Sequence, residues 1–196
     1  MMMRYAIAAA MVVTTVPVSE ADAATLVVDV AGAEGYSTFG SFQNTTQTFN
    51  IGALSRVTSL AYDVTLTAFS PSYLSEAGVA FTGSNLFEAG VSFMPGVEDE
   101  NPGASRYVGT VDLVAAGLGF AVGTDGLLRL EYFDTFNDQG VAPDSSWTGG
   151  TLTFTYDEVA AAVPETSTWI MMLAGFGMIG LAARKRSSAK TTVNFV

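Results

Sequence analysis

Two groups of acidic side chains are the residues of this sequence best suited to chemistry. One lies in a loop bounded by Pro95-Gly96 and Pro102-Gly103, and the other precedes the last predicted strand. Oxygen ligands in exposed extracellular loops are those that Ca²⁺ takes, although neither group has the spacing of an EF-hand. No cofactor is expected other than this optional Ca²⁺, and solvated carboxylates that keep the protein soluble are the simpler interpretation. The candidate ligands are Glu98, Asp99, Glu100, Asp134, Asp138 and Asp144.

Carboxylates also leave open a polysaccharide-degrading enzyme, because a glycoside hydrolase needs only an acid and a base at a suitable separation. The sequence singles out no such pair. It contains no histidine and no cysteine, which excludes Ser-His-Asp and Cys-His catalysis, disulfide bonds and thiolate metal sites. We therefore predict a protein that is not an enzyme and has no catalytic residues.

The charge balance restricts the partners of the protein. The chain has 19 acidic and 8 basic residues, for a net charge of -11. Between Ala24 and Val163 the only cations are Arg56, Arg106 and Arg129. Binding to phosphate backbones needs clustered cations, so nucleic acid is not expected as a partner.

The segment 164–186 has the residue order of a sorting or stop-transfer element. Pro164-Glu165 opens it, the uncharged segment 169–183 follows, and the basic cluster Arg184-Lys185-Arg186 closes it, as expected where cations stay cytoplasmic. A helix over 169–183 would span about 22 Å, against a hydrocarbon core of about 30 Å. We therefore predict a hydrophobic transmembrane helix that enters a membrane at least transiently, with a simple single-pass anchor as the alternative.

These residues resemble the PEP-CTERM sorting signal of Gram-negative bacteria. That signal combines Pro-Glu-Pro, a Trp-led hydrophobic segment with Met-Met and Gly-Phe-Gly, and a final arginine cluster. Thr166 stands here in place of the second proline, and a tail, 187–196, extends beyond the basic cluster. The resemblance implies recognition by a membrane-embedded exosortase, cleavage near Pro164-Glu165, and release or attachment at the cell surface. The residues that carry it are Pro164, Glu165, Trp169, Gly175, Phe176, Gly177, Arg184, Lys185 and Arg186.

The N-terminal segment 1–23 has the three parts of a secretory signal peptide. Arg4 supplies the positive region, 5–16 the apolar region, and Ala21-Asp22-Ala23 a small-residue cleavage site. We predict export through the Sec machinery, cleavage after Ala23 and a mature chain that begins at Ala24. An uncleaved first transmembrane helix is the alternative.

Between the two signals we predict one exported domain made of strands, residues 24–158, followed by a small-residue linker, residues 159–163. Apolar residues alternate with polar ones, as where Leu152, Phe154 and Tyr156 alternate with threonines, and Gly- and Pro-rich breaks separate the runs. This pattern predicts an all-β fold: a single antiparallel β-sandwich, of jelly-roll type. A turn is expected near Val114-Ala115-Ala116-Gly117. The predicted strands are 25–30, 46–51, 59–69, 78–82, 89–94, 107–113, 127–133 and 151–156.

Aromatic residues leave room for a ligand-binding role. We interpret Trp147 as an anchor at a sheet edge, with stacking against a ligand as the alternative. The other aromatics of interest are expected to pack in the core or at an edge. They are Tyr36, Phe39, Phe42, Tyr73 and Phe87.

Two functions lead on these observations. The first is a non-catalytic surface or extracellular-matrix protein, sorted by its C-terminal signal and associated with exopolysaccharide or biofilm, as the family resemblance implies. The second is a carbohydrate-binding, lectin-like module that uses Trp147, loop aromatics and optional Ca²⁺. The expected location is an inner-membrane intermediate followed by the cell surface or matrix.

Overall fold

The computed structural model describes residues 23–85, 89–138, 140–159 and 166–186. The chain divides into two compact units, Met1–Ala160 and Ala161–Val196, and each is described by itself. Several sequence predictions fall outside the described residues: the signal peptide up to Asp22 with Ala21, most of the linker, Pro164-Glu165 and the tail 187–196. Ala23, the last residue of the expected signal peptide, is the first residue of strand β1.

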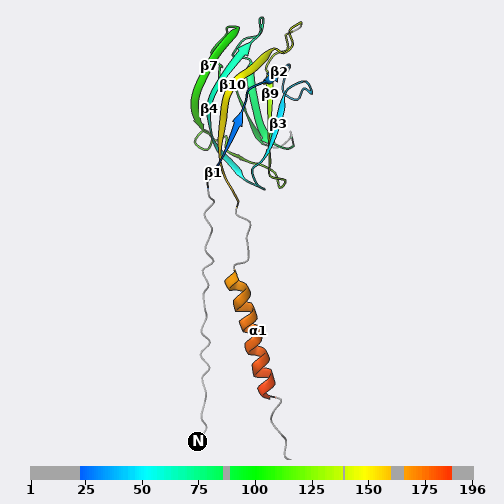
Figure 1. Ribbon diagram of the computed structural model, residues 1–196, viewed down its shortest axis with the longest axis vertical. Coiled ribbons are helices and arrows are strands. Elements are labelled where there is room, and N and C mark those ends of the chain that lie inside the picture. The colour runs from blue at the N-terminus through cyan, green and yellow to red at the C-terminus, as the bar shows by residue number, and fades with distance from the viewer. Residues whose placement is uncertain (1–22, 86–88, 139, 160–165, 187–196) are drawn as a thin grey trace, which may run out of the picture. The chain divides into compact units, whose positions relative to one another are not determined.

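The first unit contains two antiparallel sheets, called the two-sheet body below (Figure 1). The first sheet has the order β1 (Ala23–Asp29), β10 (Ser145–Asp157), β4 (Arg56–Ala68) and β7 (Gly103–Asp112), with β2 (Ala33–Gly35) paired to β10 and β8 (Phe120–Ala121) paired to β4. The second sheet has the order β3 (Thr46–Asn50), β9 (Leu127–Asp134), β5 (Ala77–Gly83) and β6 (Gly90–Phe93).

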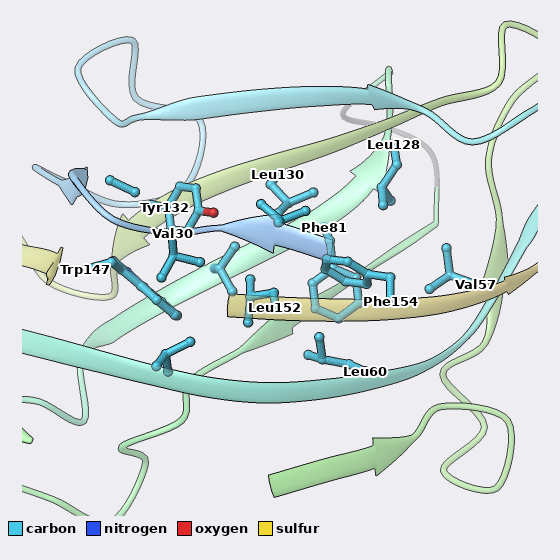
Figure 2. Close-up of a cluster of buried hydrophobic side chains, with 14 of the residues drawn as sticks. Val30, Val57, Leu60, Phe81, Leu128, Leu130, Tyr132, Trp147, Leu152 and Phe154 are labelled. Carbon is cyan, nitrogen blue, oxygen red and sulfur yellow. The ribbon is translucent and has the colours of Figure 1, made fainter. Parts of the chain in front are cut away.

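The two sheets share one hydrophobic core because their strands turn alternate side chains toward each other. In β10, Leu152 and Phe154 are fully buried, whereas the threonines between them are partly exposed. Phe81 of β5 meets Phe154 at 5.1 Å between ring centroids. Figure 2 shows side chains of both sheets gathered in this core. Burying each such side chain contributes about 1.5–3 kcal/mol to folding.

An extra residue in β10 changes which side chains face the core. Trp147 pairs with Leu66 and Gly149 with Thr65, so that Thr148 has no register partner on β4, although its hydroxyl donates to the Thr65 carbonyl at 3.3 Å. A bulge of this kind shifts the alternation by one position. Odd-numbered Trp147 and even-numbered Leu152 are therefore both fully buried.

The eight predicted strands are confirmed, as is the turn near Val114-Ala115-Ala116-Gly117, where the Gly117 N–H donates to the Val114 carbonyl at 3.0 Å. Two antiparallel sheets bear out the all-β prediction. The sequence analysis missed three pieces: β2, β8 and the first half of β10.

The second unit contains helix α1 (Thr166–Arg186). It includes Trp169, Gly175-Phe176-Gly177 and the basic cluster. Trp169, Phe176 and other large apolar side chains of α1 are exposed. Among the residues that the structure describes, no helix is long and apolar enough to cross a membrane, and the transmembrane helix expected from the sequence is thus not supported.

Candidate functional site

The structure brings the β4–β5 loop, residues 69–76, into contact with both acidic groups. The Ser75 N–H donates to the Asp99 carbonyl at 2.9 Å, and the Ser72 hydroxyl donates to Asp138 Oδ2 at 2.6 Å. The loop therefore touches both groups, and each has its own set of contacts.

In the first group, the carboxylate of Asp99 is already used by the protein. Asn101 donates to Asp99 Oδ1 at 2.9 Å, and the Tyr107 hydroxyl donates to Oδ2 at 3.0 Å. Both hydrogen bonds lower the pKa of Asp99, and the bond from Asn101 has the larger effect. Glu98, Asp99 and Tyr107 line a shallow open hollow of about 320 Å³. Glu100 follows Asp99 in the chain and does not line the hollow.

The second group is buried where β9 ends and β10 begins. Asp134 is the last residue of β9, and Asp144 immediately precedes β10. Both are 0 % exposed. Asp138, in the loop between them, gives its backbone N–H to Asp144 Oδ2 at 3.3 Å. The structure thus brings Asp134, Asp138 and Asp144 together, as their spacing suggested.

Burial dominates the electrostatics of this second group. Burial first, and then the negative charges of Glu76 and Asp144, raise the pKa of Asp134 to about 7. Burial also raises the pKa of Asp144. The Ser145 hydroxyl lies near enough to lower the pKa of Asp134, although its geometry is not that of a hydrogen bond.

Within the described ranges, no three His, Cys, Asp or Glu side chains converge in an arrangement that could hold a metal ion. A cation at the second group would therefore draw on two carboxylates together with hydroxyl, carbonyl or water oxygens, all of which Ca²⁺ accepts.

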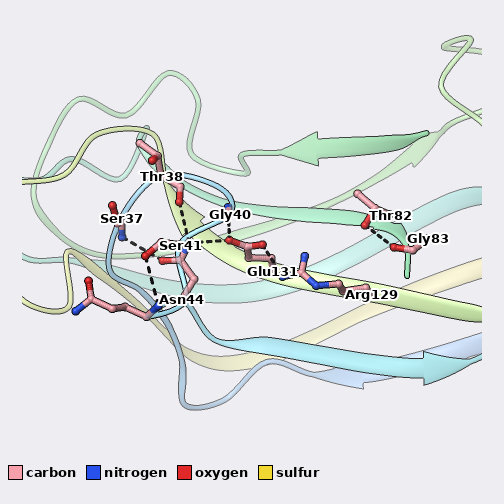
Figure 3. Close-up of polar contacts among 10 residues, drawn as sticks. Ser37, Thr38, Gly40, Ser41, Asn44, Thr82, Gly83, Arg129 and Glu131 are labelled. Atoms are coloured by element: carbon pink, nitrogen blue, oxygen red, sulfur yellow. Dashed lines mark hydrogen bonds and ion pairs between the residues drawn. The ribbon is translucent and has the colours of Figure 1, made fainter. Parts of the chain in front are cut away.

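A further buried carboxylate, Glu131 in β9, escaped the sequence analysis. Its Oε1 accepts hydrogen bonds from the Gly40 N–H at 2.6 Å and from Asn44 Nδ2 at 2.9 Å, and its Oε2 forms an ion pair with Arg129 at 2.7 Å (Figure 3). These contacts hold the β2–β3 loop against the second sheet. The signal in the sequence was the pair Arg129 and Glu131, two residues apart on one face of an otherwise apolar strand.

Trp147 lies in the core, so both sequence interpretations of it are wrong. Its side chain is 0 % exposed and packs edge-to-face on Tyr132, at 5.3 Å between ring centroids. The reason is that β10 has β4 on one side and β2 on the other at this position. Trp147 therefore neither anchors a sheet edge nor offers a stacking platform.

Other aromatic side chains are exposed on loops that are tied together at one end of the two-sheet body. The Asn137 side-chain amide donates to the Tyr36 carbonyl at 3.1 Å, and the Phe69 N–H donates to the Asp144 carbonyl at 2.9 Å. These bonds link the β2–β3, β4–β5 and β9–β10 loops. Phe87 lies outside the described residues, and Tyr36 is partly buried with its hydroxyl on Glu34. The exposed rings on the three loops are those of Phe39, Phe42, Phe69, Tyr73 and Phe136.

Comparison with known protein families decides the nature of the C-terminal segment. Residues 162–187, which include all of α1, match the family described as the PEP-CTERM protein-sorting motif. This chain carries a PEP-CTERM sorting motif. The motif implies an exported protein that an exosortase processes and sorts to the cell surface. The resemblance stated from the sequence is thereby confirmed.

Over the remainder of the chain, the similarity to known proteins is distant. No curated protein matches the sequence. The infectious bursal disease virus VP2 subviral particle is similar over 74% of this chain and 35% of its own, at 11% identity and a TM-score of 0.37. The Tobacco streak virus coat protein is similar over 71% of this chain and 90% of its own, at 10% identity and a TM-score of 0.26. The chain thus spans about a third of the length of the VP2 protein.

Proposed function

We propose that this chain is a non-catalytic exported protein of the cell surface or extracellular matrix, associated with exopolysaccharide or biofilm. The observation that carries the proposal is the sorting motif at 162–187, which follows the last strand, β10, closely in the chain. Sec-dependent export leads to an inner-membrane intermediate, and exosortase then cleaves near Pro164-Glu165. Pro164 suits that role because proline fixes its own φ and disfavours helix at the preceding residue.

The exported part is, in this proposal, a single jelly-roll β-sandwich. The strand orders β1-β10-β4-β7 and β3-β9-β5-β6 support it. In this order the first and last long strands are neighbours, and the chain passes repeatedly from one sheet to the other. With the short strands β2 and β8 set aside, each sheet has four long strands, and two such sheets connected in this way are typical of the double Greek key of a jelly roll.

The chemical inventory supports a binding or structural role over catalysis. The chain has no histidine or cysteine, and Asp99 and Glu131 each have hydrogen-bond donors that occupy their oxygens. The net charge of -11 keeps the protein soluble and disfavours anionic partners. A partner without strong negative charge, such as a neutral glycan of the extracellular matrix, is compatible with this net charge.

The proposal is tested by measuring whether the extracellular matrix of the natural host retains the protein. Matrix prepared from the natural host is washed in high salt and then treated with a polysaccharide-degrading enzyme. We expect the protein to remain with the matrix through the wash and to be released by the enzyme. Recovery of the protein only in the membrane fraction or the cytoplasm would contradict the proposal.

A second candidate, a lectin-like glycan-binding module, is favoured by the exposed rings on the three joined loops. Phe42 is 97% and Phe136 60% exposed, and sugar rings stack on such faces. A Phe42→Ala and Phe136→Ala double variant should lose retardation in gels that contain the host polysaccharide. Val108→Ala, at a residue 63% exposed on β7, is the matched control and should migrate as the wild type does.

A further inference from the structure

The end of the two-sheet body where β9 stops and β10 starts contains oxygen atoms without partners. Asp134 Oδ2, Asp144 Oδ1 and Ser145 Oγ are buried and make no hydrogen bond among the described residues. All three residues are 0 % exposed. They meet at Gly35: its carbonyl accepts from the Asp144 N–H at 2.9 Å, and a Cβ placed on it would lie 2.8 Å from Ser145 Oγ and 3.0 Å from the backbone carbon of Phe133, the residue before Asp134. Buried carboxylate and hydroxyl oxygens are normally satisfied, so this set requires an explanation.

No side-chain cation of the two-sheet body is available to balance these carboxylates. Arg106 is paired with Asp63 at 2.6 Å, and Arg129 with Glu131 at 2.7 Å. Arg56 begins β4, whereas the acidic pair lies beside Ala68 at the opposite end of that strand, since Ala68 pairs with Ser145. Thirteen residues of β4 correspond to about 40 Å. The sequence has no lysine between Ala24 and Val163.

An ionised carboxylate in a dry interior is costly unless a cation or several donors compensate it. Here two such groups adjoin, and Glu76 and Asp138 add negative charge nearby. The donors present are all oxygen atoms, and a site without histidine or cysteine selects a hard cation over zinc or copper. A protein exported from the cell meets Ca²⁺ at millimolar concentration.

We propose that Asp134, Asp144 and Ser145 bind one Ca²⁺ ion, which joins the end of β9 to the start of β10. The ion balances the two buried charges and uses the three oxygen atoms that lack hydrogen bonds. Carbonyl and water oxygens complete the coordination. The ligands all belong to the two-sheet body, and only the supply of Ca²⁺ depends on export of the protein.

Calcium titration of the protein purified from its host tests the proposal. The protein is first treated with a chelator, and CaCl₂ is then added at pH 8 while heat and melting temperature are recorded. We expect one site with a Kd of about 10⁻⁴ M and a rise in Tm of about 5 °C at saturating Ca²⁺. Absence of both binding heat and a Tm rise would overturn the proposal.

Variants locate the site and separate binding from folding. Asp134→Asn and Asp144→Asn should each weaken Ca²⁺ binding at least about tenfold, because each removes one ligand charge. In chelator at pH 8 both variants should melt at or above the wild-type temperature, since a costly buried charge is gone. Ser145→Ala, the mildest change, should weaken binding severalfold and keep the fold.

Two controls complete the design. Glu131→Gln removes a buried carboxylate three residues from Asp134 that has its own donors, so it should lower Tm equally with and without Ca²⁺. Asp99→Asn probes the other acidic loop and should leave the Ca²⁺ affinity unchanged. Loss of the Ca²⁺ response in Asp99→Asn, or its persistence in both Asn variants of the pair, would overturn the proposal.

Discussion

Two buried carboxylates of β9 show how neighbouring groups decide the state of a charge. Glu131 accepts two hydrogen bonds and an ion pair with Arg129, which compensate its removal from water. Asp134, three residues later, is equally buried but has one unpartnered oxygen and negative neighbours. Its charged form is therefore disfavoured in the folded protein, and its protonation depends on folding.

This difference predicts a pH effect in metal-free solution. The pKa of Asp134 is about 7 in the folded protein and 3.8 in the unfolded chain. Between these values the folded state holds a proton that the unfolded state has released, so the contribution of Asp134 to the free energy of unfolding falls as pH rises from about 4 to 7. The total change is at most about 4 kcal/mol.

Denaturant unfolding of wild type and Asp134→Asn in chelator, from pH 4 to pH 8, measures this effect. The free energy of the variant relative to wild type should increase with pH through that window and level off above pH 7. Subtracting the two curves removes the contribution of the other carboxylates. A difference that does not change with pH would show that Asp134 ionises as freely as an exposed carboxylate.

At the scale of elements, the bulge in β10 is the feature that joins the two halves of that strand. Gly150, two residues after Thr148, has a φ of 104°, which residues bearing a Cβ rarely adopt. A Cβ at Gly150 would also collide with the Asp63 carbonyl. Gly149 has open space around its Cβ position. The two adjacent glycines therefore have different roles.

Alanine substitution at each glycine tests this difference. Gly150→Ala should lower the free energy of unfolding by about 2–4 kcal/mol, through the strained φ and the collision with β4. Gly149→Ala is the matched control and should change it by about 0.5 kcal/mol or less. Thermal unfolding followed by circular dichroism measures both, and equal effects of the two substitutions would contradict the assignment.

The same bulge explains what sequence analysis could and could not predict. Alternation marked β4 and the second half of β10 clearly, because one buried face per strand leaves a period of two. β5 is buried along its whole length, and such strands were delimited by the Gly- and Pro-rich breaks around them. The alternation breaks at Thr148, so the run that begins at Ser145 was not recognised and Trp147 was misplaced. β2 and β8, at three and two residues, are too short to show a period.

The candidate site was predictable in part for a related reason. The spacing of Asp134, Asp138 and Asp144 around one turn indicated that they would gather, and they do. The burial of Asp134 and Asp144 was not predictable, because the segments that contact the group, 35–37 and the β4–β5 loop, come from distant parts of the sequence. Glu131 was missed because its donors, Gly40 and Asn44, lie about 90 residues away in the β2–β3 loop.

At the scale of the whole molecule, the two-sheet body and the sorting motif have separate tasks. The body has its own core and ends with β10, and the motif begins at residue 162. The positive charges of Arg184-Lys185-Arg186 follow the apolar part of the motif. We therefore expect sorting to depend on the motif and not on the body.

Replacing Arg184-Lys185-Arg186 with three alanines tests this division. The variant should remain unprocessed and fail to reach the surface, while its two-sheet body resists proteolysis as in the wild type. Lys190→Ala removes a cation outside the motif match and is the control, with normal sorting expected. Immunoblots of cell fractions measure the processing and location of both variants. Normal maturation of the triple variant would count against a role for the basic cluster.

The intact mass of the protein from its natural host, measured separately in the membrane, surface and medium fractions, tests the central claim most directly. We predict a surface or medium species that runs from about Ala24 to the neighbourhood of Pro164, which requires both signal-peptide removal and exosortase cleavage. A membrane species that retains the chain through Val196 as the sole mature form would contradict sorting by cleavage.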